Sequence, residues 1–126
     1  MTEEEIKNLR EKDSDGLLTY EYIANNIGRC DDSLPALADL LRDIDLSGQF
    51  TASAARFLNA IDAEAYRETV RTLVAATIDR DRERRYLGDL MLCIYGDDCM
   101  NRADELCAAD NNFRRIYKRL YTDTAM

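Results

Sequence analysis

Residues 34–61 read LPALADLLRDIDLSGQFTASAARFLNAI, and this stretch decides the fold class. Its first half places leucine and isoleucine at the three- and four-residue spacing of a helix, and its second half does the same with alanine, phenylalanine, leucine and isoleucine. The segment Leu46-Ser47-Gly48 interrupts the spacing between the two halves. Pro35 is tolerated because it falls in the first turn of the first helix. The stretch therefore predicts two helices joined by a short turn.

The same pattern extends over the rest of the chain. β-branched residues never form an alternating run, so no strand is predicted. A capping box of Thr2 and Glu5 starts the first helix, and turn-forming residues separate the others. The predicted helices begin near Thr2, Tyr20, Pro35, Thr51, Asp62, Leu87, Asp97 and Phe113. We expect residues 1–126 to form a single compact all-α domain of six to eight helices.

A weak internal repeat is visible in the apolar positions. Three sets lie 34 and then 33 residues apart: Ile23 with Phe57 and Leu90, Ile27 with Ile61 and Ile94, and Leu40 with Val74 and Cys107. These sets favour three stacked helical hairpins plus a C-terminal capping helix. The series also breaks, because Asn111 follows Ile44 and Ile78 at the same spacing. An irregular helical bundle therefore stays open as the alternative.

Composition narrows the class of protein. The chain has 126 residues, 46% of them hydrophobic, and a formal net charge of −8. Residues 1–63 carry 13 acids against 6 bases, and residues 64–126 carry 12 against 11. No apolar run is long enough to span a membrane, and the start of the sequence is acidic, unlike a signal peptide. We expect a cytoplasmic protein with reduced cysteines, no membrane contact and little affinity for nucleic acid.

Two turns resemble the EF-hand calcium loop. Asp13, Asp15 and Gly16 fit one copy, and Asp43, Asp45, Ser47 and Gly48 fit the second. Tyr22 and Ala54 stand where the loop needs a bidentate glutamate. We expect these residues to end one helix and cap the next, and we expect no functional calcium site. A degenerate calcium-loop protein remains an alternative.

The sequence offers no catalytic or metal-binding set. It contains no histidine, no glycine-rich phosphate loop and no nucleophile motif, so we expect a protein that is not an enzyme and uses no cofactor. Cys93, Cys99 and Cys107 lie among apolar helix positions and are predicted to be buried. Adjacent carboxylates at this charge density indicate solvated helix faces.

Two basic clusters remain. Arg80, Arg82, Arg84 and Arg85 alternate with acids, which is typical of a salt-bridged helix end. In the second cluster, Phe113, Ile116, Tyr117 and Leu120 form one apolar stripe of the last helix. Every polar position flanking that stripe is cationic. These cations are predicted to face outward, and Tyr121 to extend the stripe to its rim. The predicted partner-binding residues are Arg114, Arg115, Lys118, Arg119 and Tyr121.

The resulting hypothesis is a non-catalytic helical protein-interaction module: an adaptor, a regulator or a neutralising partner of another protein with an acidic surface. A nucleic-acid binder that uses the basic last helix is a further alternative. If Arg115 and Arg119 serve only a partner, their replacement by glutamate leaves the melting temperature within a few degrees.

Overall fold

The computed structural model describes residues 1–121, and within them the chain is helical throughout, with no strand. The eight α-helices are α1 (Glu3–Lys12), α2 (Leu17–Asn25), α3 (Leu34–Ile44), α4 (Gln49–Asp62), α5 (Arg67–Arg80), α6 (Leu87–Tyr95), α7 (Ala103–Ala109) and α8 (Asn111–Tyr121). Short 3-10 helices, η1 (Asp31–Ser33) and η2 (Cys99–Arg102), precede α3 and α7. The predicted all-α fold of six to eight helices is confirmed.

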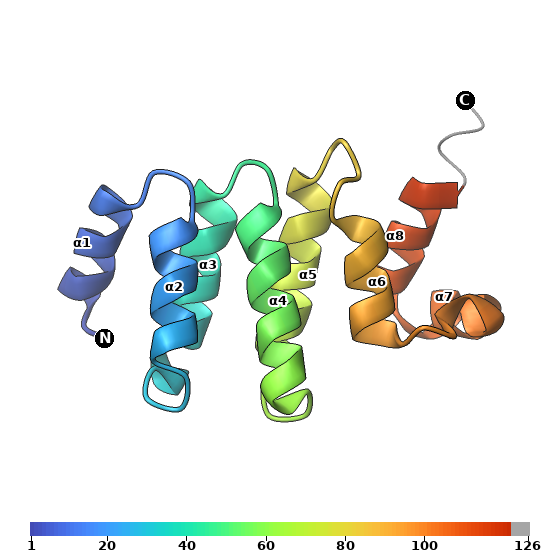
Figure 1. Cartoon of the computed structure of the whole chain (residues 1–126), viewed down its shortest axis with the longest axis horizontal. Helices are drawn as coiled ribbons and strands as arrows, with labels where there is room; N and C mark the ends of the chain where they lie inside the picture. Colours follow the sequence, from blue (N-terminus) through green and yellow to red (C-terminus); the bar gives the residue numbers. More distant parts are fainter. Residues whose placement is uncertain (122–126) are drawn as a thin grey trace.

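The helices stack in two layers (Figure 1). In one layer α1 contacts α3 and α3 contacts α5, while in the other α2 contacts α4 and α4 contacts α6. Helix α8 contacts both α5 and α6, so it closes the stack at its C-terminal end. Helix α7 makes no close contact with α6 and lies across the stack, nearly end-on in Figure 1. The residues buried between the layers form one continuous apolar core.

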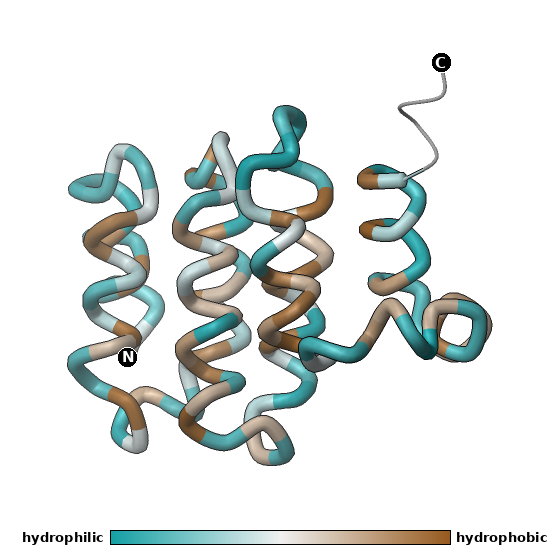
Figure 2. Tube along the Cα trace, turned by 45° about the vertical axis from the view of Figure 1, so that its right-hand side comes forward, coloured by the Kyte–Doolittle hydropathy of each residue, from teal (hydrophilic) through white to brown (hydrophobic). Residues whose placement is uncertain are grey.

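Local signals explain most helix starts and ends. The Thr2 hydroxyl accepts from the Glu5 amide at 3.1 Å, and the Glu5 carboxylate accepts from the Thr2 amide at 3.0 Å, which completes the predicted capping box. Pro35 lies in the first turn of α3. Helix α5 begins at Arg67 rather than Asp62, because the Asp62 carboxylate caps a separate turn at the Ala65 amide. Hydrophobic stretches recur along each helix between hydrophilic ones (Figure 2).

A buried aspartate joins the two helices of each of the first three hairpins. Asp13, Asp45 and Asp81 immediately follow α1, α3 and α5, and each is at most 3% exposed. Asp45 accepts from the amides of Gly48, Phe50 and Thr51 at 3.1, 2.8 and 2.8 Å. Each carboxylate therefore satisfies the free amides at the start of the following helix.

The same arrangement holds in the turns on either side. Asp13 accepts from the amides of Gly16 and Thr19 at 2.9 and 2.7 Å, and Asp81 accepts from the amides that begin α6. Burial acts to raise the pKa of Asp13, but its hydrogen bonds with Thr19, Gly16 and Asp15 outweigh burial and hold that pKa below its ordinary value. These contacts agree with the expected capping role of the calcium-like loops.

The aspartates give the register of the structural repeat. They are spaced by 32 and 36 residues, whereas the apolar columns predicted 34 and 33. Two of those columns combine positions that differ in solvent exposure. In the first, Ile23 and Leu90 are buried while Phe57 is half-buried. In the second, Ile61 is 52% exposed while Ile27 and Ile94 are half-buried. Cys107 lies on α7, which does not stack on α5 as the column with Val74 implied. The turns, rather than the apolar columns, align the hairpins.

Successive turns also pack on one another. Gly16 and Gly48 have φ values of 107° and 86°. A Cβ built on Gly16 would lie 3.3 Å from the Asp45 Cβ, and one built on Gly48 would lie 3.3 Å from the Asp81 Cβ. Arg84 holds the equivalent place in the third turn with φ 60°. Its guanidinium donates to the Arg119 carbonyl of α8 at 3.1 Å. The turn between α5 and α6 thus contacts α8 through the side chain of Arg84.

Replacing Gly48 by alanine should destabilise the stack by about 1–2 kcal/mol, because the new side chain must adopt a left-handed φ and displace the Asp81 main chain. Urea denaturation measures the change. Gly88→Ala is the matched control, since no atom lies within 4 Å of its built Cβ and it sits inside α6, where alanine is preferred. An equal loss in both variants would show that turn packing contributes nothing.

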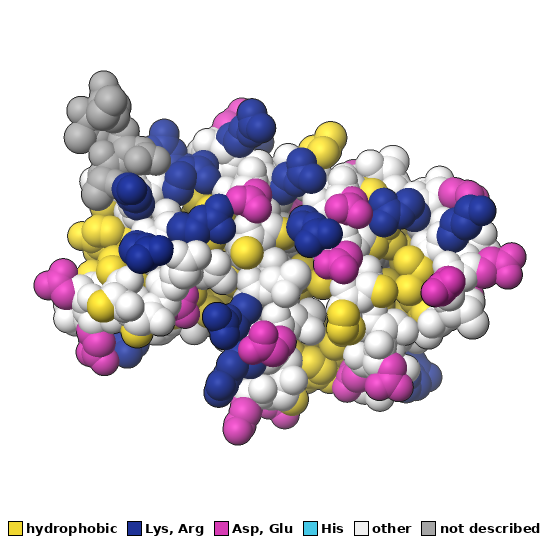
Figure 3. Space-filling view, turned by 180° about the vertical axis from the view of Figure 1, so that it is seen from behind, with side chains coloured by type: hydrophobic (Ala, Val, Ile, Leu, Met, Phe, Trp, Pro, Cys, Tyr) yellow, Lys and Arg dark blue, Asp and Glu magenta, His cyan; other side chains and the backbone are white. Residues whose placement is uncertain are grey.

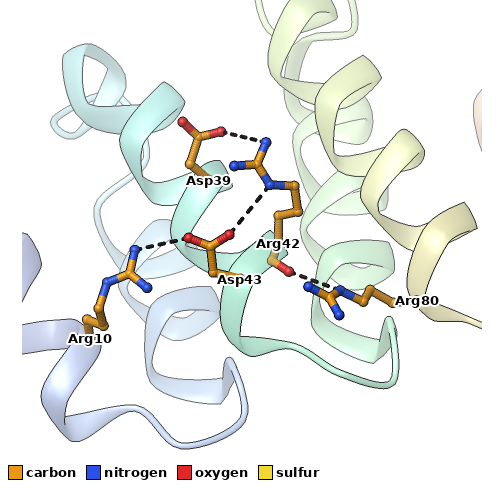
Figure 4. A network of polar contacts seen from close by, with 5 residues as sticks. All are labelled: Arg10, Asp39, Arg42, Asp43 and Arg80. Atoms are coloured by element: carbon orange, nitrogen blue, oxygen red, sulfur yellow. Dashed lines mark hydrogen bonds and ion pairs between the residues drawn. The ribbon is translucent and has the colours of Figure 1, made fainter.

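Exposed ion pairs connect neighbouring helices of the first layer (Figure 4). Arg10 of α1 contacts Asp43 of α3 at 3.2 Å, and Arg42 contacts Asp39 and Asp43 at 3.4 and 3.6 Å. Arg80 of α5 donates to the Arg42 carbonyl at 3.2 Å. Each pair is solvent-exposed and contributes about 0–1 kcal/mol, so the network adds to the core rather than replacing it.

Candidate protein-interaction surface at the C-terminal end

The two ends of the stack are built differently. Helix α1 buries none of its residues and turns only Ile6 and Leu9 partly inward, so its outer side is polar. A terminal helix with a polar outer face is what a helical stack needs to stay soluble. The opposite end is formed by α7, which exposes Asp104 and Glu105, and by α8, which carries aromatic side chains and positive charge. That contrast makes the C-terminal end the first candidate for a functional surface.

Helix α8 packs through the stripe predicted from its sequence. Phe113 and Ile116 are fully buried, while Tyr117 and Leu120 are half-buried. The rings of Tyr95, Phe113, Tyr117 and Tyr121 form a series, with successive centroids 5.1, 6.2 and 5.2 Å apart. Tyr121, the last of the series, is 50% exposed. The aromatic series therefore runs from the core to the surface at this end of the stack.

A shallow cavity lies beside this series. It has a volume of about 430 Å³ and is lined by Tyr117 of α8 and by residues of η2 and α7, including Met100, Ala103 and Glu105. Met100 is 39% exposed. Tyrosine and methionine beside an open cavity are typical of interface centres, because both bury much apolar area.

Two of the predicted partner-binding cations lie on the outer side of α8. Arg114 is exposed, and its guanidinium donates to the Asn111 side chain within the same helix. Lys118 is also exposed and follows Arg114 by one helical turn, and Tyr121 follows next on the same face. Arg114 and Lys118 therefore face outward as predicted, and Tyr121 extends the apolar stripe to the exposed rim of α8.

Arg115 and Arg119 instead contact α5. Arg115 pairs with Asp79 at 2.6 Å. Arg119 donates to the carbonyls of Ile78, Asp81 and Arg82 at 2.7, 2.9 and 3.3 Å. The outward orientation expected for Arg119 is therefore wrong. The free carbonyls at the end of a helix attract a cation, and no local pattern reveals that the end of α5 lies against α8.

The structure brings the two basic clusters of the sequence together. Arg84, in the turn between α5 and α6, contacts the end of α8, and Arg119 contacts that turn in return. Arg85 pairs with Glu83 at 2.5 Å in the turn after α5, whereas Arg80 and Arg84 donate to carbonyls, so the predicted salt-bridged helix end forms only in part. Figure 3 shows lysine and arginine side chains gathered over this end of the molecule.

A cavity of about 460 Å³ lies on another side of the stack. It is lined by α4, α5 and the turn between them, and by residues at the ends of α6 and α7 and the start of α8. Two of its polar groups contact each other: Tyr95 donates to Asp110 at 2.9 Å, and Asp110 also accepts from the Phe113 amide at 3.0 Å. Burial and the nearby Asp110 carboxylate raise the pKa of Tyr95, so its hydroxyl keeps its proton. These contacts position α8 and assign no chemistry to the cavity.

The cysteines and the calcium-like loops are the remaining candidates from the sequence. Cys99 is buried as predicted and Cys107 is half-buried, but Cys93 is exposed, because it lies on the outer side of α6. Within residues 1–121, no group of three or more cysteine or carboxylate side chains is arranged to hold a metal ion. The calcium-like loops direct Asp13 and Asp45 at backbone amides instead.

Comparison with protein-family models, curated proteins and solved structures finds no match to this chain. None of the helices in the described residues combines the length and apolar character needed to cross a bilayer. The interpretation of the surface therefore depends on its own geometry and charge.

Proposed function

We propose that the protein is a non-catalytic helical interaction module that binds another protein through its C-terminal end. The observation that carries the proposal is the difference between the two ends of the stack. Helix α1 ends the stack with a polar surface, whereas α8 ends it with exposed Tyr121, half-buried Tyr117 and a row of cations. An aromatic and cationic surface is suited to burial against a partner.

Charge supports an acidic surface on that partner. The chain carries a net charge of −8, yet the outer side of α8 carries Arg114 and Lys118 and no acid. Positive charge concentrated on the outer side of α8 steers an acidic partner to that helix and discriminates against basic proteins. The half-buried tyrosines then supply the apolar contact that charge alone does not give.

Charge reversal at this end should abolish partner capture. The full chain, immobilised by its N-terminus, is incubated with lysate, and proteins bound by the wild type are identified by mass spectrometry. Arg114→Glu combined with Lys118→Glu should lose the stoichiometric partner, because two attractive charges become repulsive. Lys7→Glu combined with Lys12→Glu is the matched control, since it changes the net charge equally on α1 and should retain the partner.

The outcome distinguishes this surface from others. Equal capture by wild type, double variant and control would place the interface elsewhere. Equal loss in the double variant and the control would indicate a nonspecific charge effect. Circular dichroism of each variant shows whether its helical content is unchanged, so a loss of capture is not a loss of fold.

A cytoplasmic location also belongs to this proposal. All four cysteines are free thiols, including the exposed Cys93, which is what a reducing compartment maintains. Fractionation of cells that produce the protein would test this location, and recovery from an oxidising compartment would overturn it.

A further inference from the structure

The turn between α5 and α6 and the outer side of α8 form one surface. We call it the cationic seam and define it by Arg82, Arg84, Arg85, Arg114, Arg115 and Lys118. The two parts are joined by Arg84, which donates to the Arg119 carbonyl at 3.1 Å, and by Arg119, which donates to the carbonyls of Asp81 and Arg82 at 2.9 and 3.3 Å. Residues more than 30 positions apart therefore build a single surface.

The seam carries positive charge in excess. Asp79 pairs with Arg115, and Glu83 pairs with Arg85. The third nearby acid, Asp81, is 2% exposed and directs its carboxylate inward to the amides that begin α6. Within residues 1–121, these six cations lie beside the two exposed carboxylates of Asp79 and Glu83, on a chain whose net charge is −8.

Two cavities adjoin the seam. One, of about 330 Å³, lies between α5 and α8 and is lined by Ile78, Arg115 and Lys118 among others. The other, of about 280 Å³, lies between the second and third turns and is lined by Leu46, Arg82 and Arg85 among others. Both cavities flank the C-terminal end of α5, so a bound chain could contact them in succession.

The geometry of the turn does not require an apolar residue at Leu46. It directly follows the capping Asp45, and the equivalent residues after Asp13 and Asp81 are Ser14 and Arg82. Its side chain is 73% exposed, the highest exposure of any large apolar residue in residues 1–121. An exposed leucine beside arginines offers an apolar contact next to a cationic one.

We infer that the cationic seam binds an acidic peptide segment that carries an apolar residue for Leu46. This inference rests on the proposed function and names the chemistry of the partner. Carboxylates of the segment pair with the guanidinium group of Arg82 and replace Glu83 at that of Arg85, because the planar donors of arginine match a carboxylate. The apolar residue of the segment packs on Leu46 in the adjoining cavity.

An acidic peptide fits the seam better than a nucleic acid does. A nucleic-acid backbone presents continuous negative charge, which the two carboxylates of the seam and the overall charge of the chain repel. It also presents no aliphatic group for Leu46. A peptide can place its acidic residues opposite the arginines and leave gaps opposite Asp79 and Glu83.

Fluorescence anisotropy with the purified full chain tests the inference. The probe is a short labelled peptide of glutamates with two leucines, compared with an all-glutamate peptide and with labelled single-stranded oligothymidylate of equal length. Arg82→Glu combined with Arg85→Glu should weaken binding of the leucine-containing peptide about tenfold or more. Lys7→Glu combined with Lys12→Glu, with the same net charge, should bind as the wild type does.

Leu46→Ser separates the apolar contact from the charge. It introduces the residue found in the equivalent first turn, so the fold should tolerate it. It should weaken binding of the leucine-containing peptide several-fold, in line with the loss of one apolar contact, and leave the all-glutamate peptide unaffected.

Three results would overturn the inference: absence of peptide binding, equal binding by the seam variant and the α1 control, or tighter binding of the oligonucleotide than of the peptide. An unchanged affinity in Leu46→Ser would overturn the role of Leu46. If lysate capture depends on Arg114 and Lys118 but no acidic peptide binds, the proposed function stands and this inference fails. If the peptide binds but every variant of the cationic seam still captures the lysate partner as the wild type does, the proposed function fails instead.

Discussion

Replacing Asp45 by alanine is expected to lower the free energy of unfolding by about 3 kcal/mol or more, because three amides, two of them buried, lose their acceptor together. The Asp45 carboxylate is the acceptor for the amides of Gly48, Phe50 and Thr51, and the residue is 1% exposed. Since the turn lies between α3 and α4 in the middle of the stack, its loss affects the packing on both sides.

Urea denaturation followed by circular dichroism measures this effect. Asp43→Ala, in the last turn of α3, is the matched control, because the Asp43 carboxylate is exposed and contacts Arg10 and Arg42 at 3.2 and 3.6 Å. The control should lose about 1 kcal/mol or less. Comparable losses in the two variants would contradict the capping role. The native spectrum of Asp45→Ala, before urea is added, shows whether the variant still folds.

Most of the helical structure could be predicted from the sequence because its signals are local. The capping box at Thr2, the early proline of α3 and the apolar stripe of α8 each depend on residues a few positions apart. The calcium-like pattern in two turns was informative for the same reason. Asp13 and Asp45, with a glycine three residues later, specify a tight turn in which the carboxylate faces backbone amides.

The features that the sequence did not reveal depend on contacts between distant residues. Apolar columns suggested a register for the repeat, but helical periodicity places apolar residues at many spacings, and only the stacked turns select one. The crosswise position of α7 leaves α8 to contact α5. Because α8 contacts α5, the basic cluster of α8 lies beside the basic cluster of the turn between α5 and α6. Cys93 is exposed because its side of α6 faces away from the core, which composition cannot show.

Contacts between residues distant in the sequence also separate the predicted partner-binding residues into two groups. Arg114, Lys118 and Tyr121 lie on the outer face of α8, whereas Arg115 and Arg119 contact α5. All four cations look equivalent in the sequence, because each flanks the same apolar stripe. They differ in what lies beside them, and a mutation that tests partner binding must therefore avoid Arg119.

Arg119→Glu is expected to destabilise the protein by about 2 kcal/mol or more, which corresponds to a fall in melting temperature on the order of 10 °C. The wild-type guanidinium satisfies carbonyls of Ile78, Asp81 and Arg82 at the end of α5. Glutamate removes these donors and places a negative charge at the negative end of the α5 dipole, so both effects act in the same direction.

Differential scanning calorimetry can separate this structural role from partner binding. Arg114→Glu makes the same change of charge on the outer face of the same helix and should shift stability by only about 0.5 kcal/mol. Arg119→Lys should fall between Arg119→Glu and the wild type, because lysine keeps the positive charge but lacks the planar fork that reaches several carbonyls at once. If Arg119→Glu melted with the wild type, the contacts with α5 would be incidental, and Arg119 would return to the outward surface that the sequence predicted. A loss confined to Arg119 would instead show that this arginine holds α8 on the stack, and the outer cations depend on that position.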